Sequence, residues 1–229
     1  MIWDVLRAVV SARVAETGRQ ALDIVDVGGG TGGLAVPFAA LGHNVTVVDP
    51  SPDALAAAQR RAAEAGARLT SVQGDAASLD SVAGVAAADL IICHNVLEYV
   101  ESPADAMGAI ARVLRPSATV SVLASNAVAA VLHRALAGRF AEARALLVGG
   151  APAAGATPRR FTLPELTALI EAAGLRAGQA HGLRVFGGLI PGALLDGAAA
   201  DALRALEEAA ASTPPLRDIA SQLHVLGHR

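Results

Sequence analysis

The first half of the chain alternates short apolar runs with longer amphipathic stretches. Residues 2–17 place apolar side chains at helical spacing, which predicts a first amphipathic helix. Beyond it, strand, helix and strand alternate, and this rhythm predicts βαβ units, a parallel sheet and the α/β fold class. The expected strands are Leu22–Val27, Asn44–Val48, Arg68–Gln73, Ala88–Cys93 and Thr119–Leu123, with helices near 32–41, 53–66 and 103–114 between them.

The second half is less regular. Residues 149–158 are rich in Gly, Ala and Pro without an apolar period, which is typical of a mobile loop. We expect a single domain over residues 1–229, with a helical and mobile lid insertion at about 127–160. The other expected elements are a helical stretch at Val128–Val148, a helix at Leu163–Ala173 with Thr162 as its N-cap, a strand within Leu175–Phe186, a helix at Ala199–Ala211 and a last strand at Gln222–Gly227.

Composition excludes several kinds of chemistry. The 229 residues contain no lysine, so all 18 basic residues are arginine and no lysine can form a Schiff base or reach the phosphates of a P-loop. The one cysteine, Cys93, excludes internal disulfides and Cys-rich metal sites, and it fits a reducing compartment. Six aromatic residues are too few for a nucleic-acid stacking platform of the RRM or OB type.

The chain shows no pattern of a membrane span or a signal peptide. Its most apolar stretch, Ala118–Leu132, is interrupted by polar residues and falls short of the ~20 residues that a span requires. Asp4, Arg7 and Arg13 interrupt the segment where a signal peptide would be apolar. We therefore expect a cytoplasmic protein with no membrane contact, and we expect no metal because the histidines lack ligand-like spacing with carboxylates.

The strongest local signal lies in residues 23–33, where a buried strand runs into glycines that open a helix. Glycine lets the backbone approach a ligand closely, and the helix N-terminus offers free N–H donors. Gly28, Gly30 and Gly33 fit the dinucleotide-binding pattern G-x-G-x-x-G. Asp26, two residues before the first glycine, would repel a pyrophosphate, whereas it could order the loop and meet the ammonium of an amino-acid ligand.

Further candidate residues follow the later strands. Asp49 ends the second strand, where an acid accepts hydrogen bonds from ribose hydroxyls, and Asp75 and His94 follow the third and fourth strands. Taken singly, the two aspartates could cap helices and His94 could be a buried core histidine. Because the carboxyl ends of parallel strands meet at one edge of a sheet, their joint occurrence favours a ligand site there.

Asp26, Gly28, Gly30 and Gly32 also fit the D-x-G-x-G-x-G loop, and the chain resembles class I S-adenosylmethionine-dependent methyltransferases over its whole length. The resemblance implies a Rossmann-like, mostly parallel seven-stranded sheet with an antiparallel last strand and a helical insertion after strand five. It also implies methyl transfer from S-adenosylmethionine, with S-adenosylhomocysteine as product. The implied cofactor-binding residues are Asp26, Gly28, Gly29, Gly30, Gly32, Asp49, Pro50, Ser51, Asp75, Ala76, His94 and Asn95.

One branch resembles the chain further, namely the bacterial tRNA methyltransferases that esterify the carboxylate of 5-carboxymethoxyuridine at the wobble position. The resembling stretches are residues 94–100, 113–116, 126–140, 182–186 and 223–225. In that branch a lysine-rich run stands where this chain has residues 149–157, and an N-terminal lid with a basic residue that contacts the cofactor precedes the helix in which Met1 lies. These departures affect the choice of acceptor and the way in which the site closes, and they leave the glycine loop that binds the cofactor unchanged.

A carboxylate acceptor needs a cation to hold it rather than a general base. Arg184 is our candidate, because a guanidinium binds a carboxylate in a fixed bidentate geometry. Tyr99, Asn126, His133 and Arg159 are further candidates for acceptor binding.

Three hypotheses follow. The first is a methyltransferase for a tRNA carboxylate, supported by five arginines against one acid within 127–160. The second is a small-molecule O- or N-methyltransferase whose acceptor enters beneath that insertion. The third is a non-catalytic cofactor-binding module. A nicotinamide-dependent dehydrogenase is disfavoured by Asp26, and the sequence leaves the oligomeric state open.

Overall fold

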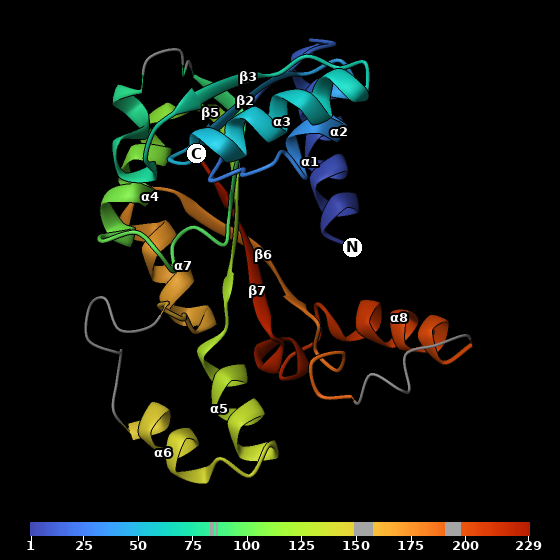
Figure 1. The fold of residues 1–229 in the computed structure, drawn as a ribbon, viewed down its shortest axis with the longest axis vertical. Coiled ribbons are helices and arrows are strands. Elements are labelled where there is room, and N and C mark those ends of the chain that lie inside the picture. The colour runs from blue at the N-terminus through green and yellow to red at the C-terminus, as the bar shows by residue number, and fades with distance from the viewer. Residues whose placement is uncertain (83–84, 86, 149–157, 191–197) are drawn as a thin grey trace. The chain divides into compact units, whose positions relative to one another are not determined.

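A computed structural model of the chain describes all residues except 83–84, 86, 149–157 and 191–197 (Figure 1). Its strands form a seven-stranded sheet in the order β3-β2-β1-β4-β5-β7-β6. The strands are β1 (Asp23–Val27), β2 (Asn44–Asp49), β3 (Thr70–Gln73), β4 (Ala88–His94), β5 (Leu114–Ser125), β6 (Arg176–Leu183) and β7 (Gln222–His228).

The first four strands are parallel, as the βαβ rhythm predicts. β1 pairs with β2 in the register Asp26↔Val47 and with β4 in the register Asp26↔Ile92, and β2 pairs with β3. β4 contains the apolar run Leu90–Cys93 and is buried almost throughout, because a parallel sheet is covered on both faces. The crossover connections therefore place the carboxyl ends of these strands at one edge of the sheet.

The last strand is antiparallel to its neighbours, which confirms the expected sheet. Near the start of β5, Ser117 and Ala118 pair with Arg229 at the end of the chain, whereas Asn126, just after β5, pairs with Ser221 before β7. Such a reversed order of partners defines an antiparallel pair.

The helices follow the predicted pattern with corrected boundaries. The expected stretch Val128–Val148 is two helices, because Gly138, at a φ of 73°, separates them. Thr162 and Glu165 form the capping box that begins the next helix. The helices are α1 (Ile2–Thr17), α2 (Ala35–Ala40), α3 (Pro52–Glu64), α4 (Pro103–Val113), α5 (Ala127–Leu136), α6 (Phe140–Val148), α7 (Leu163–Ala172) and α8 (Ala198–Ala210), with 3-10 turns η1 (Ala76–Ser81) and η3 (Leu216–Ile219).

Two expectations are corrected and one lies outside the described residues. The fifth strand is longer than Thr119–Leu123 at both ends, and the helix expected near 32–41 has its first regular turn only at Ala35. Of the expected mobile loop, residues 149–157 are outside the described part of the chain. No helix in the described ranges combines the length and apolar character needed to cross a bilayer.

The chain divides into two compact units. Unit 1 comprises Met1–Val122, Leu169–Gly178 and Leu226–Arg229, and unit 2 comprises Leu123–Ala168 and Gln179–Val225. Unit 1 contains a large apolar core in which α1 and α2 pack on β1, β2 and β4 around Leu6, Leu22 and Phe38. Unit 2 has a smaller core that includes Val185, Ala210 and Ala220.

Candidate active site

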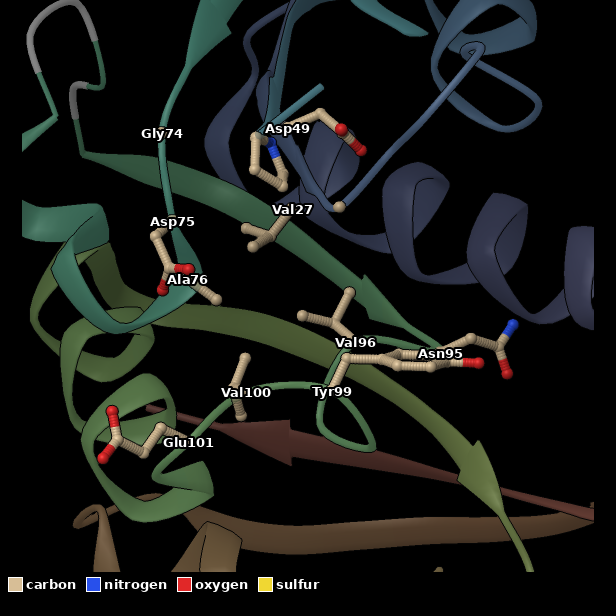
Figure 2. Close-up of a pocket in the computed structure, with 12 residues that line it drawn as sticks. Val27, Asp49, Gly74, Asp75, Ala76, Asn95, Val96, Tyr99, Val100 and Glu101 are labelled. Carbon is tan, nitrogen blue, oxygen red and sulfur yellow. The ribbon is translucent and has the colours of Figure 1, made fainter. Parts of the chain in front are cut away.

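A pocket of about 360 Å³ lies in unit 1 at the carboxyl ends of the parallel strands. Figure 2 shows its walls converging from the ends of β1, β2 and β3 and from the turn that follows β4. This is the edge at which open α/β sheets bind ligands. The lining residues are Val27, Gly28, Asp49, Pro50, Gly74, Asp75, Ala76, Asn95, Val96, Tyr99, Val100 and Glu101.

The glycine loop forms the wall nearest β1. The Gly28 N–H donates to the Val48 carbonyl at 2.7 Å, which ties the loop to β2. Gly28 adopts a φ of 65°, and a Cβ there would collide with the Val96 side chain. Because that conformation and that close approach both favour glycine, the loop requires glycine at this position.

Asp49 joins this loop to the next turn. Its Oδ2 accepts from the Gly30 N–H at 2.9 Å, and its Oδ1 accepts from the Ser51 N–H at 2.8 Å. The side chain is largely buried and borders the pocket (Figure 2). Each carboxylate oxygen has two acceptor sites, so each oxygen retains one for a ligand.

Asp26 lies beneath the loop and does not belong to the pocket lining. The residue is only 4% exposed, and a Cβ at Gly29 would lie 2.7 Å from its Cγ. Burial raises the pKa of Asp26 to about 7, and the negative charge of Asp49 adds to this increase. The hydrogen bond from the Ala35 N–H opposes it, because that bond stabilises the ionised carboxylate. The expected role in ordering the loop therefore has a structural basis, while contact with a ligand stays a prediction.

Asp75 borders the opposite side of the pocket. Its Oδ1 accepts from the Ala77 N–H at 2.8 Å, so the side chain caps the short turn η1. The preceding Gly74 donates its N–H to the Asp49 carbonyl at 3.3 Å, which holds the ends of β2 and β3 together. Capping uses one acceptor site of Asp75 and leaves the other oxygen at the pocket.

His94 and Cys93 end β4, and neither is among the residues that line the pocket. Nε2 of His94 lies 2.7 Å from Oγ of Ser121, and burial lowers the pKa of His94 to about 4, so the ring is neutral at pH 7. Burial, together with the charges of Glu98 and Asp26, raises the pKa of Cys93 to about 12, which keeps the thiol protonated and unreactive.

The turn after β4 supplies residues that the sequence patterns missed. Asn95 takes a left-handed φ of 56°, and the Tyr99 N–H closes a turn on the Val96 carbonyl at 2.9 Å. Tyr99 is 73% exposed and borders the pocket, and its role in acceptor binding stays a prediction. Val96 and Val100 lie in the resembling stretch 94–100 but were not named as site residues, and Glu101 had no sequence signal beyond following a strand.

The other acceptor candidates lie in unit 2. Asn126 is 2% exposed; its amide donates to the Asp218 and Ala220 carbonyls, and its Oδ1 accepts from the Val128 N–H, so it caps α5. Arg184 is exposed at a left-handed φ of 57°, and its guanidinium makes no ion pair or hydrogen bond within the described ranges. His133 and Arg159 are half-buried.

Comparisons with known proteins agree with this architecture. Residues 25–122 match the family described as "Methyltransferase domain". The tRNA 5-carboxymethoxyuridine methyltransferase of Escherichia coli K12 is 34% identical over 142 residues, which cover 61% of this chain and 52% of that protein. A ubiquinone biosynthesis O-methyltransferase of Methylocella silvestris is 33% identical over 169 residues, covering 72% and 62%. The chain thus spans between half and two thirds of these relatives' lengths.

Solved structures share the fold. An S-adenosylmethionine-dependent methyltransferase from Mesorhizobium loti superposes with a TM-score of 0.63 at 22% identity, covering 96% of both chains. The magnesium protoporphyrin IX methyltransferase of Synechocystis, with bound SAH, gives a TM-score of 0.63 at 16% identity and covers 99% of this chain and 83% of that one. Residues 25–122 thus match the methyltransferase-domain family, and the chain shares the fold of the solved S-adenosylmethionine-dependent methyltransferases.

Proposed function

We propose that the protein is an S-adenosylmethionine-dependent methyltransferase whose unit 1 pocket binds the cofactor. The observation that carries this proposal is Asp49, which ends β2, is fixed by the Gly30 and Ser51 N–H groups and still presents acceptor sites to the pocket. A carboxylate held in this way suits the two hydroxyls of a ribose. The apolar side chains of Val27, Val96 and Val100 beside it suit a purine ring.

In this proposal different residues contact different parts of the cofactor. Asp49 accepts from the ribose, Asp75 and Ala76 face the adenine, and Gly28, Gly29, Gly30 and Gly32 let the backbone approach closely. Pro50 and Ser51 shape the turn after β2. Asp26, His94 and Asn95 lie nearest the methionine end.

The chain has mainly to orient and desolvate the reactants. When bound, the cofactor supplies an electrophilic methyl carbon attached to a sulfonium sulfur. A carboxylate acceptor is already ionised at pH 7, so no side chain has to remove a proton. What such an acceptor requires is a fixed cation and an aligned approach.

We further propose an oxygen acceptor, namely the carboxylate of a modified wobble uridine in tRNA. The E. coli relative supports this acceptor, as do Arg184, with its guanidinium unpaired within the described ranges, and the arginines of residues 127–160. The test is incubation with radiolabelled S-adenosylmethionine and bulk tRNA, followed by digestion to nucleosides. We expect label in one modified uridine with the wild-type protein and none with Arg184→Ala; unlabelled nucleosides from the wild type would overturn the tRNA assignment.

One observation favours a second candidate, a small apolar acceptor. Helices α5 and α6 expose Leu136, Phe140, Leu147 and Val148, each about 70% accessible, in the insertion beneath which such an acceptor is expected to enter. A ubiquinone biosynthesis O-methyltransferase is among the relatives. Incubation of the labelled cofactor with an organic extract of small molecules tests this candidate, because transfer would move label into the organic phase.

A further inference from the structure

Arg184, directly after β6, has a backbone conformation that arginine rarely adopts. Its φ of 57° lies in the left-handed region, where a Cβ crowds the following carbonyl oxygen. Such a conformation persists only where the surrounding structure fixes it, and it is concentrated at functional sites. We propose that Glu207 of α8 is a positioning residue, which fixes this backbone and thereby holds the Arg184 guanidinium for the acceptor carboxylate. The inference rests on the proposed function and deepens it.

Three consecutive backbone N–H groups after Arg184 donate to one carboxylate. The Val185 N–H donates to Oε2 of Glu207 at 2.7 Å. The Phe186 and Gly187 N–H groups donate to its Oε1, at 2.8 Å and 2.6 Å. Because a charged acceptor makes stronger hydrogen bonds than a neutral one, this carboxylate fixes the chain directly after Arg184.

A second set of contacts fixes the carbonyl of Arg184. Ser221 donates both its N–H and its hydroxyl to this carbonyl, at 3.2 Å and 3.1 Å. The Ser221 carbonyl in turn accepts from the Asn126 N–H at 3.1 Å, and the Asn126 amide donates to the Ala220 carbonyl at 2.7 Å. The peptide unit between Arg184 and Val185 is therefore hydrogen-bonded at both its carbonyl and its N–H.

The same segment adjoins another acceptor candidate. A Cβ at Gly188 would lie 3.0 Å from Nε2 of His133 and 2.5 Å from Oγ of Ser221, so the chain passes close to the His133 side chain. Arg184 and His133 thus border one short segment of unit 2, residues 184–188. A segment that adjoins two acceptor candidates is a place where backbone precision affects the alignment of an acceptor.

The docking of α8 next to β6 has other contacts besides Glu207. The Gly182 N–H donates to the carbonyl of Ala211, which follows the helix, at 2.7 Å. Val185 and Ala210 also belong to the same apolar cluster of unit 2. Since these contacts already dock the helix, the three bonds of Glu207 serve to define the path of residues 185–187.

Transfer of label from radiolabelled S-adenosylmethionine to bulk tRNA measures the effect of Glu207. Glu207→Gln keeps one of the two acceptor oxygens, and we expect kcat to fall about tenfold because the guanidinium is less well aligned. The KM for S-adenosylmethionine should not change, since the proposed cofactor pocket lies in unit 1. Glu208→Gln is the matched control, because Glu208 is the exposed neighbour on α8 and loses the same charge; it should keep the wild-type rate.

A double-mutant cycle separates positioning from a general loss of structure. Arg184→Lys keeps a positive charge without the rigid fork of a guanidinium, so its remaining activity depends less on alignment. In that background Glu207→Gln should lower kcat only about twofold, against about tenfold in the wild-type background.

Hydrogen–deuterium exchange, followed by mass spectrometry, supplies a readout that needs no acceptor. The amides of residues 185–187 should exchange faster in Glu207→Gln, because they lose part of their acceptor. In Glu208→Gln they should exchange at the wild-type rate.

The outcomes are distinct. Unchanged amide exchange or an unchanged kcat in Glu207→Gln would overturn the positioning role while leaving the proposed function intact. An equal loss of kcat in the wild-type and Arg184→Lys backgrounds would also overturn it, because Glu207 would then act independently of the guanidinium. Absence of label in tRNA with the wild-type protein would overturn the proposed carboxylate acceptor, and the role of Glu207 with it.

Discussion

At the edge of the sheet where β1 and β4 begin, Asp23 and Asp89 are surrounded by arginines; at the edge where the parallel strands end, Asp26, Asp49 and Asp75 meet backbone N–H groups. Both edges belong to unit 1 and are built from the same four strands. The two edges differ in the partners of their carboxylates. Asp23 and Asp89 pair with arginines and stabilise the fold, whereas Asp49 and Asp75 border the pocket and stay available to a ligand.

The amino edge is a closed ion-pair network. Asp89 has a fully buried side chain that is bonded by Arg19, by Arg13 at 3.2 Å, by Arg115 at 3.2 Å and by the Asp23 N–H at 3.0 Å. Burial alone would raise the pKa of Asp89, but these bonds hold it below its ordinary value. The network links α1 to β1, β4 and β5.

At the carboxyl edge, the partners of the aspartates within the described part of the chain are backbone N–H groups. Among the described residues, no ion pair involves Asp26, Asp49 or Asp75. Holding carboxylates without guanidinium partners forgoes stabilisation. At Asp49 and Asp75, which border the pocket, it leaves acceptor sites open for a ligand. We therefore expect substitutions at the amino edge to lower the free energy of unfolding, and substitutions at the carboxyl edge to change its pH dependence and the affinity for the cofactor.

The largest expected effect is on stability at the amino edge. Asp89→Ala leaves three guanidinium groups without their shared carboxylate, and we expect it to lower the free energy of unfolding by about 4 kcal/mol, because one partner of a buried ion pair is removed. Urea unfolding measures this loss. The comparison of edges would be weakened if the loss were below about 1 kcal/mol, the range of an exposed ion pair.

The next effect is on pH dependence at the carboxyl edge. The pKa of Asp26 rises from 3.8 to about 7 on folding, so its contribution to stability is full below pH 3.8 and is lost as the pH rises to about 7. His94 acts oppositely, because its lowered pKa costs stability as the pH falls from 6.5 to about 4. Relative to wild type, Asp26→Asn should gain about 3 kcal/mol between pH 4 and 7. Urea unfolding of both proteins between pH 4 and 7 measures this gain. If the free energy of unfolding of Asp26→Asn ran parallel to that of the wild type across this range, the raised pKa of Asp26 would be contradicted.

The smallest effect compares two glycines with the same backbone strain. Gly30 and Gly66 both have a positive φ and open space where a Cβ would lie, so alanine should cost each about 1 kcal/mol of unfolding free energy. Alanine keeps the backbone N–H but disfavours the left-handed φ that directs the Gly30 N–H to Asp49, so only Gly30→Ala should also weaken binding of S-adenosylmethionine. Calorimetric titration of S-adenosylmethionine into both variants checks this. Equal affinities in Gly30→Ala and Gly66→Ala would contradict a role of the glycine loop in cofactor binding.

The sequence assigns Gly28, Asp49, Asp75 and Asn95 to strand ends, and all four line one pocket, because strand ends in a parallel sheet converge whatever the details of packing. Their role in cofactor binding stays a prediction. The sequence did not predict Glu101, whose position depends on a left-handed residue at Asn95 and on the turn after it.

The length of β5 escaped prediction for a similar reason. Pro116 and Ser117 are typical of a strand boundary, yet the strand begins at Leu114. Ser117 donates its N–H to Arg229, and the Arg229 N–H donates to Ala118. Local pattern carries no information about a partner at the other end of the chain, and pairing of this kind decides where a strand begins and ends.

Calorimetric titration of S-adenosylmethionine into Asp49→Ala and Asp23→Ala tests most directly whether the carboxyl edge binds the cofactor. Both variants replace an aspartate at an end of a parallel strand, on opposite edges of unit 1. We expect Asp49→Ala to weaken binding about 30-fold, or about 2 kcal/mol, through lost hydrogen bonds to a charged acceptor, and Asp23→Ala to bind with wild-type affinity despite lower stability. Wild-type affinity in Asp49→Ala, or an equal loss in Asp23→Ala, would contradict the assignment of the carboxyl edge as the cofactor site.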